Sequence, residues 1–165
     1  MKHGPAIAIT VTIFLLSWFG RGIQRFFREA VGLEGLLLFV SVVCLIFLVS
    51  VARFFELRRG KIRLLLLLFP LGIWFLRGNP EEAVHLVEYG ALALALLWGA
   101  NETSGRWRAA IKAGFMASLI GLGDEVLQGI NPERFFDLRD IVINVSGAIL
   151  TLILFRLRRT DAENI

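Results

Sequence analysis

Six apolar runs constrain this chain more than any other feature. They cover residues 5–19, 36–52, 62–76, 83–100, 109–122 and 141–155. Most are somewhat shorter than the roughly 20 helical residues that cross an untilted bilayer core, so flanking aromatic and arginine side chains must extend them. With 56% hydrophobic residues, the chain is too apolar for an ordinary soluble domain. The sequence therefore predicts an all-α integral membrane protein, a bundle of about six transmembrane helices.

The 165 residues are expected to form a single membrane domain, since no linker or low-complexity tract divides them. Cys44 is the only cysteine and lies inside an apolar run, so it has no intrachain disulfide partner. The net charge of +4 is modest, and the Lys and Arg residues gather at the ends of the runs. Membrane lipids, and not nucleic acid, are therefore the expected partners.

The distribution of Lys and Arg between the loops predicts the orientation. With six spans, one side carries twelve of the 18 basic residues and the other carries six: Arg21, Arg25, Arg28, Arg77, Arg134 and Arg139. Basic residues are retained on the cytoplasmic side. The pattern predicts a multi-pass protein of the cytoplasmic membrane with both termini in the cytoplasm and these six arginines on the outer side.

The segment "RGIQRFFREAVGLEG" between the first two runs has two interpretations. Arg21, Arg25 and Arg28 recur at helical spacing, with Phe26 and Phe27 at other positions of the same turns. An amphipathic helix of this kind can lie flat in the membrane interface. It can equally extend the first transmembrane helix past the head groups. Both interpretations place arginine side chains near the phosphates of the outer leaflet.

Polar residues enter three of the runs from this outer side at helical spacing. The three sets are His85, Glu88 and Tyr89; Asp124, Glu125 and Gln128; and Asp137, Asp140, Asn144 and Gly147. Each residue alone has an ordinary explanation, as a solvated boundary residue or as a hydrogen bond or close contact between helices. The coincidence of three sets on one side favours a shared functional site, because ionisable groups inside a membrane bundle are usually functional.

The same residues form a family pattern. The motif H-x-x-x-Y-G-x-L-A in "HLVEYGALA", then D-E-x-x-Q, then R-x-x-D-x-x-D-x-x-x-N-x-x-G resembles the VanZ-like family, known for a glycopeptide (teicoplanin) resistance protein. The motif region covers about residues 81–155. The resemblance implies a small helical membrane protein of the bacterial cell envelope that processes lipid head groups or lipid-linked saccharides. The family-like polar residues are His85, Tyr89, Asp124, Glu125, Gln128, Arg134, Asp137, Asp140, Asn144 and Gly147.

These side chains suit phosphate chemistry. Arg134 offers planar donors for phosphate oxygens, and His85 is a candidate general acid/base or nucleophile. Asp124, Glu125 and Asp140 are expected to orient His85 or to bind a divalent cation. The predicted catalytic residues are His85, Asp124, Glu125 and Asp140. The predicted substrate-binding residues are Tyr89, Gln128, Arg134, Asp137 and Asn144.

The sequence is compatible with two classes of function. The first is an enzyme at the outer face, a phosphatase, hydrolase or transferase acting on a lipid head group or lipid-linked saccharide. The second is a non-catalytic membrane module that binds lipid, a glycopeptide antibiotic or another polar ligand with the same residues. Catalysis requires His85 and an acid to converge around an open cavity, whereas a closed and fully paired cluster favours a structural role.

Overall fold

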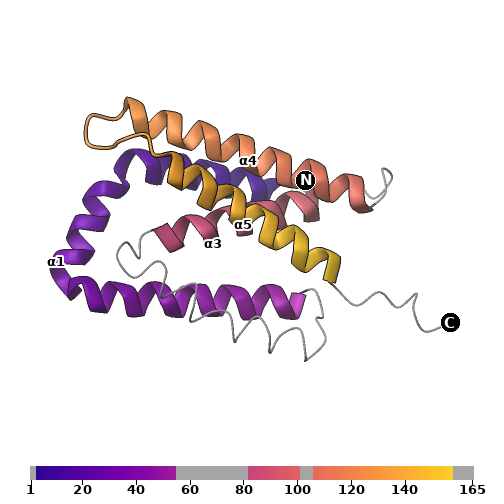
Figure 1. Cartoon of the computed structure of the whole chain (residues 1–165), viewed down its shortest axis with the longest axis horizontal. Helices are drawn as coiled ribbons and strands as arrows, with labels where there is room; N and C mark the ends of the chain where they lie inside the picture. Colours follow the sequence, from indigo (N-terminus) through magenta and orange to yellow (C-terminus); the bar gives the residue numbers. More distant parts are fainter. Residues whose placement is uncertain (1–2, 55–81, 101–105, 158–165) are drawn as a thin grey trace.

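The computed structural model describes residues 3–54, 82–100 and 106–157. These residues form four helices and no strand (Figure 1): α1 (Gly4–Phe54), α3 (Glu82–Gly99), α4 (Arg106–Ile130) and α5 (Leu138–Leu157). The all-α prediction is confirmed. The predicted run 62–76 lies outside the described residues, so the number of six spans stays a prediction.

Helix α1 folds around the rest of the molecule because it bends. Gly32 interrupts it with a φ of 70° and a ψ of 177°, a backbone conformation that side chains other than glycine rarely adopt. Figure 1 shows α1 running along the molecule, turning across its end, and returning. We call residues 4–20 the first leg, residues 21–31 the cross segment and residues 33–54 the second leg. The cross segment keeps its helical conformation.

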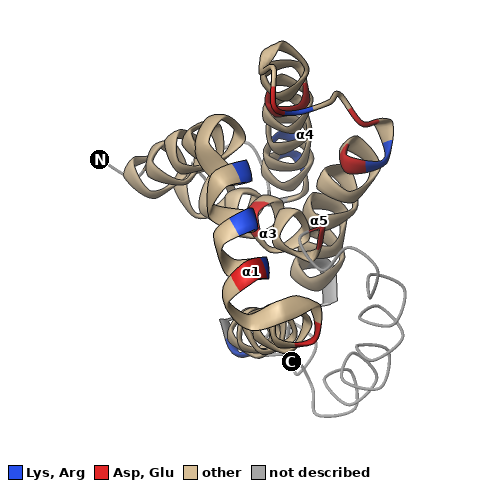
Figure 2. Cartoon of the chain, turned by 90° about the vertical axis from the view of Figure 1, so that its left-hand side faces the viewer, with Lys and Arg blue, Asp and Glu red and all other residues tan. Residues whose placement is uncertain are grey.

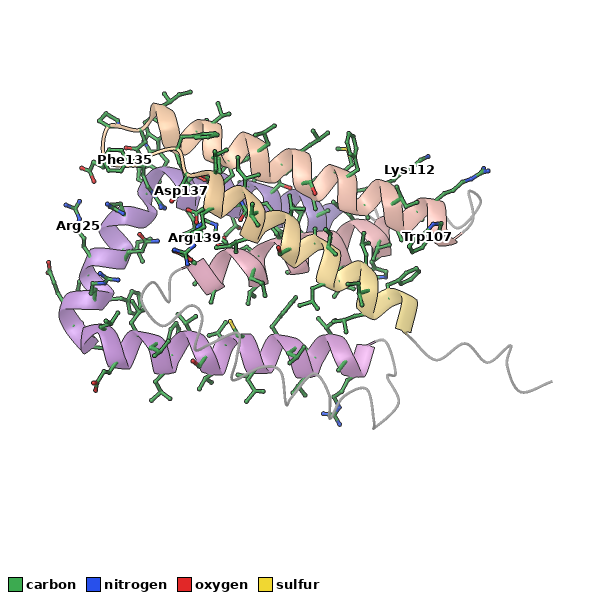
Figure 3. All side chains as sticks on the ribbon, viewed as in Figure 1. Arg25, Trp107, Lys112, Phe135, Asp137 and Arg139 are labelled. Atoms are coloured by element: carbon green, nitrogen blue, oxygen red, sulfur yellow. The ribbon has the colours of Figure 1, made fainter. Side chains whose placement is uncertain are left out.

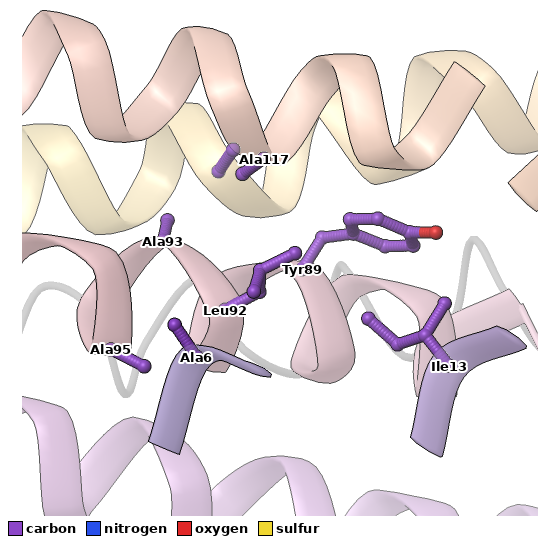
Figure 4. Close-up of a cluster of buried hydrophobic side chains, with 8 residues drawn as sticks. Ala6, Ile13, Tyr89, Leu92, Ala93, Ala95 and Ala117 are labelled. Carbon is purple, nitrogen blue, oxygen red and sulfur yellow. The ribbon is translucent and has the colours of Figure 1, made fainter. Parts of the chain in front are cut away.

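Helix α3 is the centre of the bundle and contacts α1, α4 and α5. Its sequence is rich in alanine and leucine, the residues with the highest helix propensity. Figure 4 shows its buried face, where Tyr89, Leu92 and Ala93 meet Ala6 of the first leg and Ala117 of α4. The second leg packs elsewhere on α3, in a cluster that also includes Ala83. Both legs of α1 therefore rest on the central helix.

Small residues let α3 and α5 approach closely. A Cβ atom added at Gly147 of α5 would lie only 2.6 Å from the backbone oxygen of Leu86. One turn further along α5, the buried Thr151 hydroxyl donates a hydrogen bond of 3.1 Å to the backbone oxygen of Gly90. Glycine contacts and a hydroxyl bonded across the interface are typical of helix pairs in membranes.

The outer surfaces of the helices are strongly apolar. Large hydrophobic side chains such as Phe19, Ile46, Phe115 and Leu138 are exposed. Two helices in the described part are long and apolar enough to cross a membrane, Gly4–Arg53 and Leu138–Phe155. The predicted runs 83–100 and 109–122 lie in α3 and α4, which do not pass the same test.

Candidate functional site

The polar residues converge at one end of the bundle, where α3 begins, α4 ends and α5 begins. Figure 2 views this end and shows charged residues on the cross segment of α1, on the end of α4 and at the start of α5. In Figure 3, Arg25, Asp137 and Arg139 lie at this end, whereas Trp107 and Lys112 lie at the other. The three helices thus bring their three polar sets to the same end, as the spacing predicts.

A cavity of about 640 Å³, here called the polar cavity, opens at this end. It lies between the cross segment, the loop after α4 and the first turns of α3 and α5. Its lining consists of Arg21, Gln24, Arg25, Arg28, Glu82, His85, Glu133, Arg134, Asp137 and Asp140. Four arginines therefore face four carboxylates and one imidazole. Of the predicted site residues, it includes His85, Arg134, Asp137 and Asp140.

A second cavity of about 180 Å³, here called the apolar cavity, lies between the two legs of α1 and the start of α3. Most of its lining is hydrophobic, and the polar residues that line it are Ser17, Gln24, His85, Glu88, Asp124, Gln128 and Arg134. Gln24, His85 and Arg134 line both cavities. The two cavities therefore meet at one imidazole and one guanidinium group.

Arg134 is held at this meeting point by the loop after α4. Its Nη2 atom lies 3.3 Å from the backbone oxygen of Leu16, to which it donates, and its buried Nε atom has no hydrogen-bond partner in the described structure. Burial, followed by the positive charge of Arg21, lowers the pKa of Arg134 below its ordinary value. A negative charge bound between the two arginines would relieve this repulsion and satisfy the free Nε donor.

Asn131 fixes the loop that carries Arg134. Its Nδ2 atom donates a hydrogen bond of 2.9 Å to the backbone oxygen of Trp18, and its Oδ1 atom accepts one of 3.0 Å from the backbone N–H of Glu133. The backbone N–H of Arg134 donates to the backbone oxygen of Asn131 at 3.0 Å. Because the amide joins this tight turn to α1, the position of Arg134 is determined by both.

His85 lies mostly buried at the start of α3. Its Nδ1 atom is 3.8 Å from Oε2 of Glu88, one turn along the same helix, and makes no hydrogen bond with a described residue. The ring borders both cavities, and Asp124 borders the apolar cavity beside it. An imidazole between two acidic side chains and open to a cavity is able to take up and return a proton.

The predicted acids of α4 make a buried network. Gln128 Nε2 donates to Asp124 Oδ2 at 3.1 Å and to Glu125 Oε1 at 2.9 Å. The other oxygen of Glu125 accepts a hydrogen bond of 3.1 Å from the backbone N–H of Asp137. Glu125 is fully buried and is not among the lining residues of either cavity. Its contacts connect α4 to the start of α5.

Tyr89 and Asn144 lie deeper in the bundle, fully buried. A Cβ atom added at Gly121 would lie 3.1 Å from both Tyr89 Cε1 and Asn144 Cβ, so glycine permits their approach. Both amide atoms of Asn144 have no hydrogen-bond partner among the described residues, whereas the Tyr89 hydroxyl lies beside the Asp124 carboxylate. Buried polar atoms are normally paired, so the Asn144 amide has unused capacity for a water molecule.

The start of α5 is fixed by Asp137 and Arg139. Asp137 Oδ1 accepts a hydrogen bond of 2.8 Å from the backbone N–H of Arg139, which caps the helix. The side chain of Arg139 forms an ion pair of 3.0 Å with Glu82 of α3. This geometry leaves Asp140, in the first turn of α5, facing the polar cavity.

The sequence prediction did not assign the cross-segment arginines, Gln24 or Glu82 to the site. Their signal was present, because Gln24 and Arg25 follow Arg21 by three and four positions and precede Arg28 by four and three, which places all four on one helix face. Nothing in the sequence, however, indicated that this face would cover the start of α3.

The described residues contain no group of three or more His, Cys, Asp or Glu side chains that could hold a metal ion. Asp124, Glu125 and Asp140 are therefore not gathered into such a group. A divalent cation bound by these three carboxylates stays a prediction.

Comparison with known families identifies the chain. The family described as VanZ/LLP1 matches residues 6–159. The protein belongs to the VanZ/LLP1 family. The suspected resemblance is thus confirmed, and it extends over the first helices as well as the motif region. No curated protein and no solved structure matches the chain significantly. Family membership and the two long apolar helices together indicate a membrane protein.

Proposed function

We propose that this VanZ/LLP1 protein is an enzyme that acts on the phosphate-bearing head group of a lipid or a lipid-linked saccharide. One observation carries the proposal: four arginines and a histidine line one open cavity at the end of an apolar bundle. Arginine fits phosphate oxygens through paired N–H donors. A cavity at the end of a membrane bundle lies at the depth at which lipid head groups are found.

Two of the four carboxylates that line the polar cavity already form ion pairs with arginines. Arg25 forms an ion pair with Glu133, and Glu82 forms one with Arg139. Arg134 has an Nε donor without a hydrogen-bond partner in the described structure. It also lies near Arg21, and the two positive charges repel each other. In the proposal, Arg134 and Arg21 hold the phosphate, which places the phosphorus beside His85.

His85 supplies the acid/base chemistry of the proposed reaction. A water molecule attacks phosphorus while the imidazole removes its proton, and the bond between phosphorus and the departing oxygen breaks. The imidazolium then returns the proton to that oxygen. Asp140 in the polar cavity and Asp124 beside the ring stabilise the charged imidazole. Such positioned groups typically contribute a rate factor of about 100 to 10,000.

The proposal places this end of the bundle at the outer face of the cytoplasmic membrane. Its support is the excess of basic residues in the segments that six spans would leave on the opposite side. The proposed topology has six spans and both termini in the cytoplasm. Reporter fusions after Ala100 and after Arg159 should both report a cytoplasmic position. An externally active reporter at either position would move the site to the inner leaflet.

The function is tested first in cells and then with purified protein. A deletion strain should accumulate the substrate lipid, and wild-type protein should reverse this change, whereas His85→Ala should not. Purified protein in nanodiscs is then incubated with the accumulated lipid, and the products are measured by mass spectrometry. Glu29→Gln, a change at an exposed residue of the cross segment, is the matched control and should retain full activity.

The non-catalytic alternative makes a different prediction in the same experiment. A lipid or polar ligand would bind to the wild type and be lost in Arg134→Ala, but no product would form. His85→Ala would then complement the deletion. This pair of outcomes would replace the enzyme by a binding module.

A further inference from the structure

The apolar cavity has a shape and a position that the head-group proposal does not use. It borders Ile13 and Leu16 of the first leg, Leu36 and Val40 of the second leg, and Val84 of α3. Its volume of about 180 Å³ is comparable to that of engineered apolar cavities of about 150 Å³ that bind benzene. The space is therefore large enough for a section of hydrocarbon chain.

The rim of this cavity is apolar as well as exposed. Phe39 is 56% exposed and Val84 is 38% exposed. Phe39 also stacks on Phe27 of the cross segment, with ring centroids 6.1 Å apart. The exposed part of the cavity lining is therefore apolar at these positions, as the surroundings of a hydrocarbon chain need to be.

The position of Arg134 between the two cavities determines the orientation of an anionic ligand. The two cavities share Gln24, His85 and Arg134, and Arg134 has the unpaired Nε donor. An anionic group at Arg134 would be followed on one side by open polar space and on the other by an apolar space. The carboxylates of Glu88 and Asp124 also border the apolar cavity, and both lie close to His85.

We propose that the substrate of this site is an anionic phosphate amphiphile that binds with its phosphate at Arg134 and its hydrocarbon chain in the apolar cavity. This inference rests on the proposed function and adds to it a binding site for the hydrocarbon chain of the substrate. It also assigns α1 a role in specificity, because both of its legs line the chain site. A phosphate without a chain would leave the apolar cavity unfilled and would bind more weakly.

The test uses ethyl, butyl and hexyl phosphate as probes, with the protein in nanodiscs. Burial of each added methylene group is expected to tighten binding by up to about fourfold. Val84→Phe places a ring in the cavity and should abolish most of this gain, so that hexyl phosphate binds little more tightly than ethyl phosphate. The matched control is Val126→Phe on α4, an exposed position outside the lining of both cavities, which should retain the wild-type gain.

A second variant keeps the test decisive if Val84→Phe does not fold. Phe39→Ala removes an exposed rim side chain and should reduce the gain per methylene group. If the gain is the same in wild type, Val84→Phe and Phe39→Ala, the chain enters the bilayer and not the cavity, and the inference is wrong. Failure of the head-group proposal looks different: ethyl phosphate binding would then be unaffected by Arg134→Ala.

Discussion

The two sides of α3 are packed in opposite ways. Toward α5, glycines bring the helices into backbone contact, and Thr151 joins them by a hydrogen bond. Toward the bent helix α1, the start of α3 faces two cavities of about 180 and 640 Å³. The same helix thus has one side that excludes any ligand and one side that leaves room for it.

This difference in packing assigns two tasks to two parts of the molecule. Helices α3, α4 and α5 position the reactive side chains, and the side toward α1 leaves room for the ligand. His85, Asp124 and Asp140 come from α3, α4 and α5, and their mutual placement depends on close helix packing. The arginines that line the polar cavity come mostly from the cross segment of α1. This segment faces the starts of α3 and α5 across the cavity. Rigid packing behind reactive groups is what precise acid/base geometry requires, whereas a less tightly packed wall admits a ligand.

The largest effect is expected from a change in the tightly packed helices α3, α4 and α5. It tests whether these helices supply the acid/base groups of the reaction. Asp140→Asn preserves volume but removes the negative charge in the first turn of α5. If Asp140 stabilises the His85 imidazolium, activity should fall by about 100-fold to 10,000-fold, with normal membrane abundance. Turnover of the accumulated lipid by purified protein measures the loss.

Two results would argue against this role of Asp140. Full activity with a normal thermal midpoint would remove it from the catalytic set. Misfolding would show instead that its polar stripe mainly holds helices together. Glu29→Gln, an equal removal of charge on the exposed cross segment, controls for a general charge effect.

The next effect concerns the tight side of α3 directly. Gly147→Ala forces a Cβ atom to 2.6 Å from the Leu86 backbone oxygen, so backbone must shift at a cost of about 1–3 kcal/mol. Thermal unfolding in detergent should show a lower midpoint. Gly22→Ala in α1 meets no atom within 4 Å, and alanine favours the helix by about 1 kcal/mol. An equal loss in both variants would contradict the contrast between the two sides.

A smaller effect is expected at the hydrogen bond across the same interface. Thr151→Val keeps the shape but loses the bond of 3.1 Å to the Gly90 backbone oxygen, worth about 0.5–1.5 kcal/mol. Ser146→Ala is the control, since that exposed hydroxyl donates only to Val142 of its own helix. The midpoint of the Thr151 variant should fall further than that of the control. Equal midpoints would assign the close approach to the glycines alone.

Much of the candidate site was predictable from the sequence. The part that was not predicted has a physical reason. Helical spacing predicted that three polar sets meet at one end, and the structure brings them there. Spacing gives the side of a helix but not its depth or its neighbour. Tyr89 and Asn144 are therefore completely buried although both were expected to bind substrate. The arginine-lined wall depends on where α1 bends, and Gly32 alone does not specify the direction of the bend.

The smallest effect concerns the contact that ties α1 to the other side of the polar cavity. Arg25 and Glu133 form an ion pair of 2.8 Å, with 62% of each side chain exposed. Exposed pairs contribute about 0.2–1 kcal/mol and weaken as salt screens them. A double-mutant cycle with Arg25→Gln and Glu133→Gln should give a coupling free energy in this range, and it should decrease at high ionic strength. A larger, salt-insensitive coupling would mean that α1 is held as firmly as α5, and the contrast between a fixed unit and a less tightly packed wall would no longer hold.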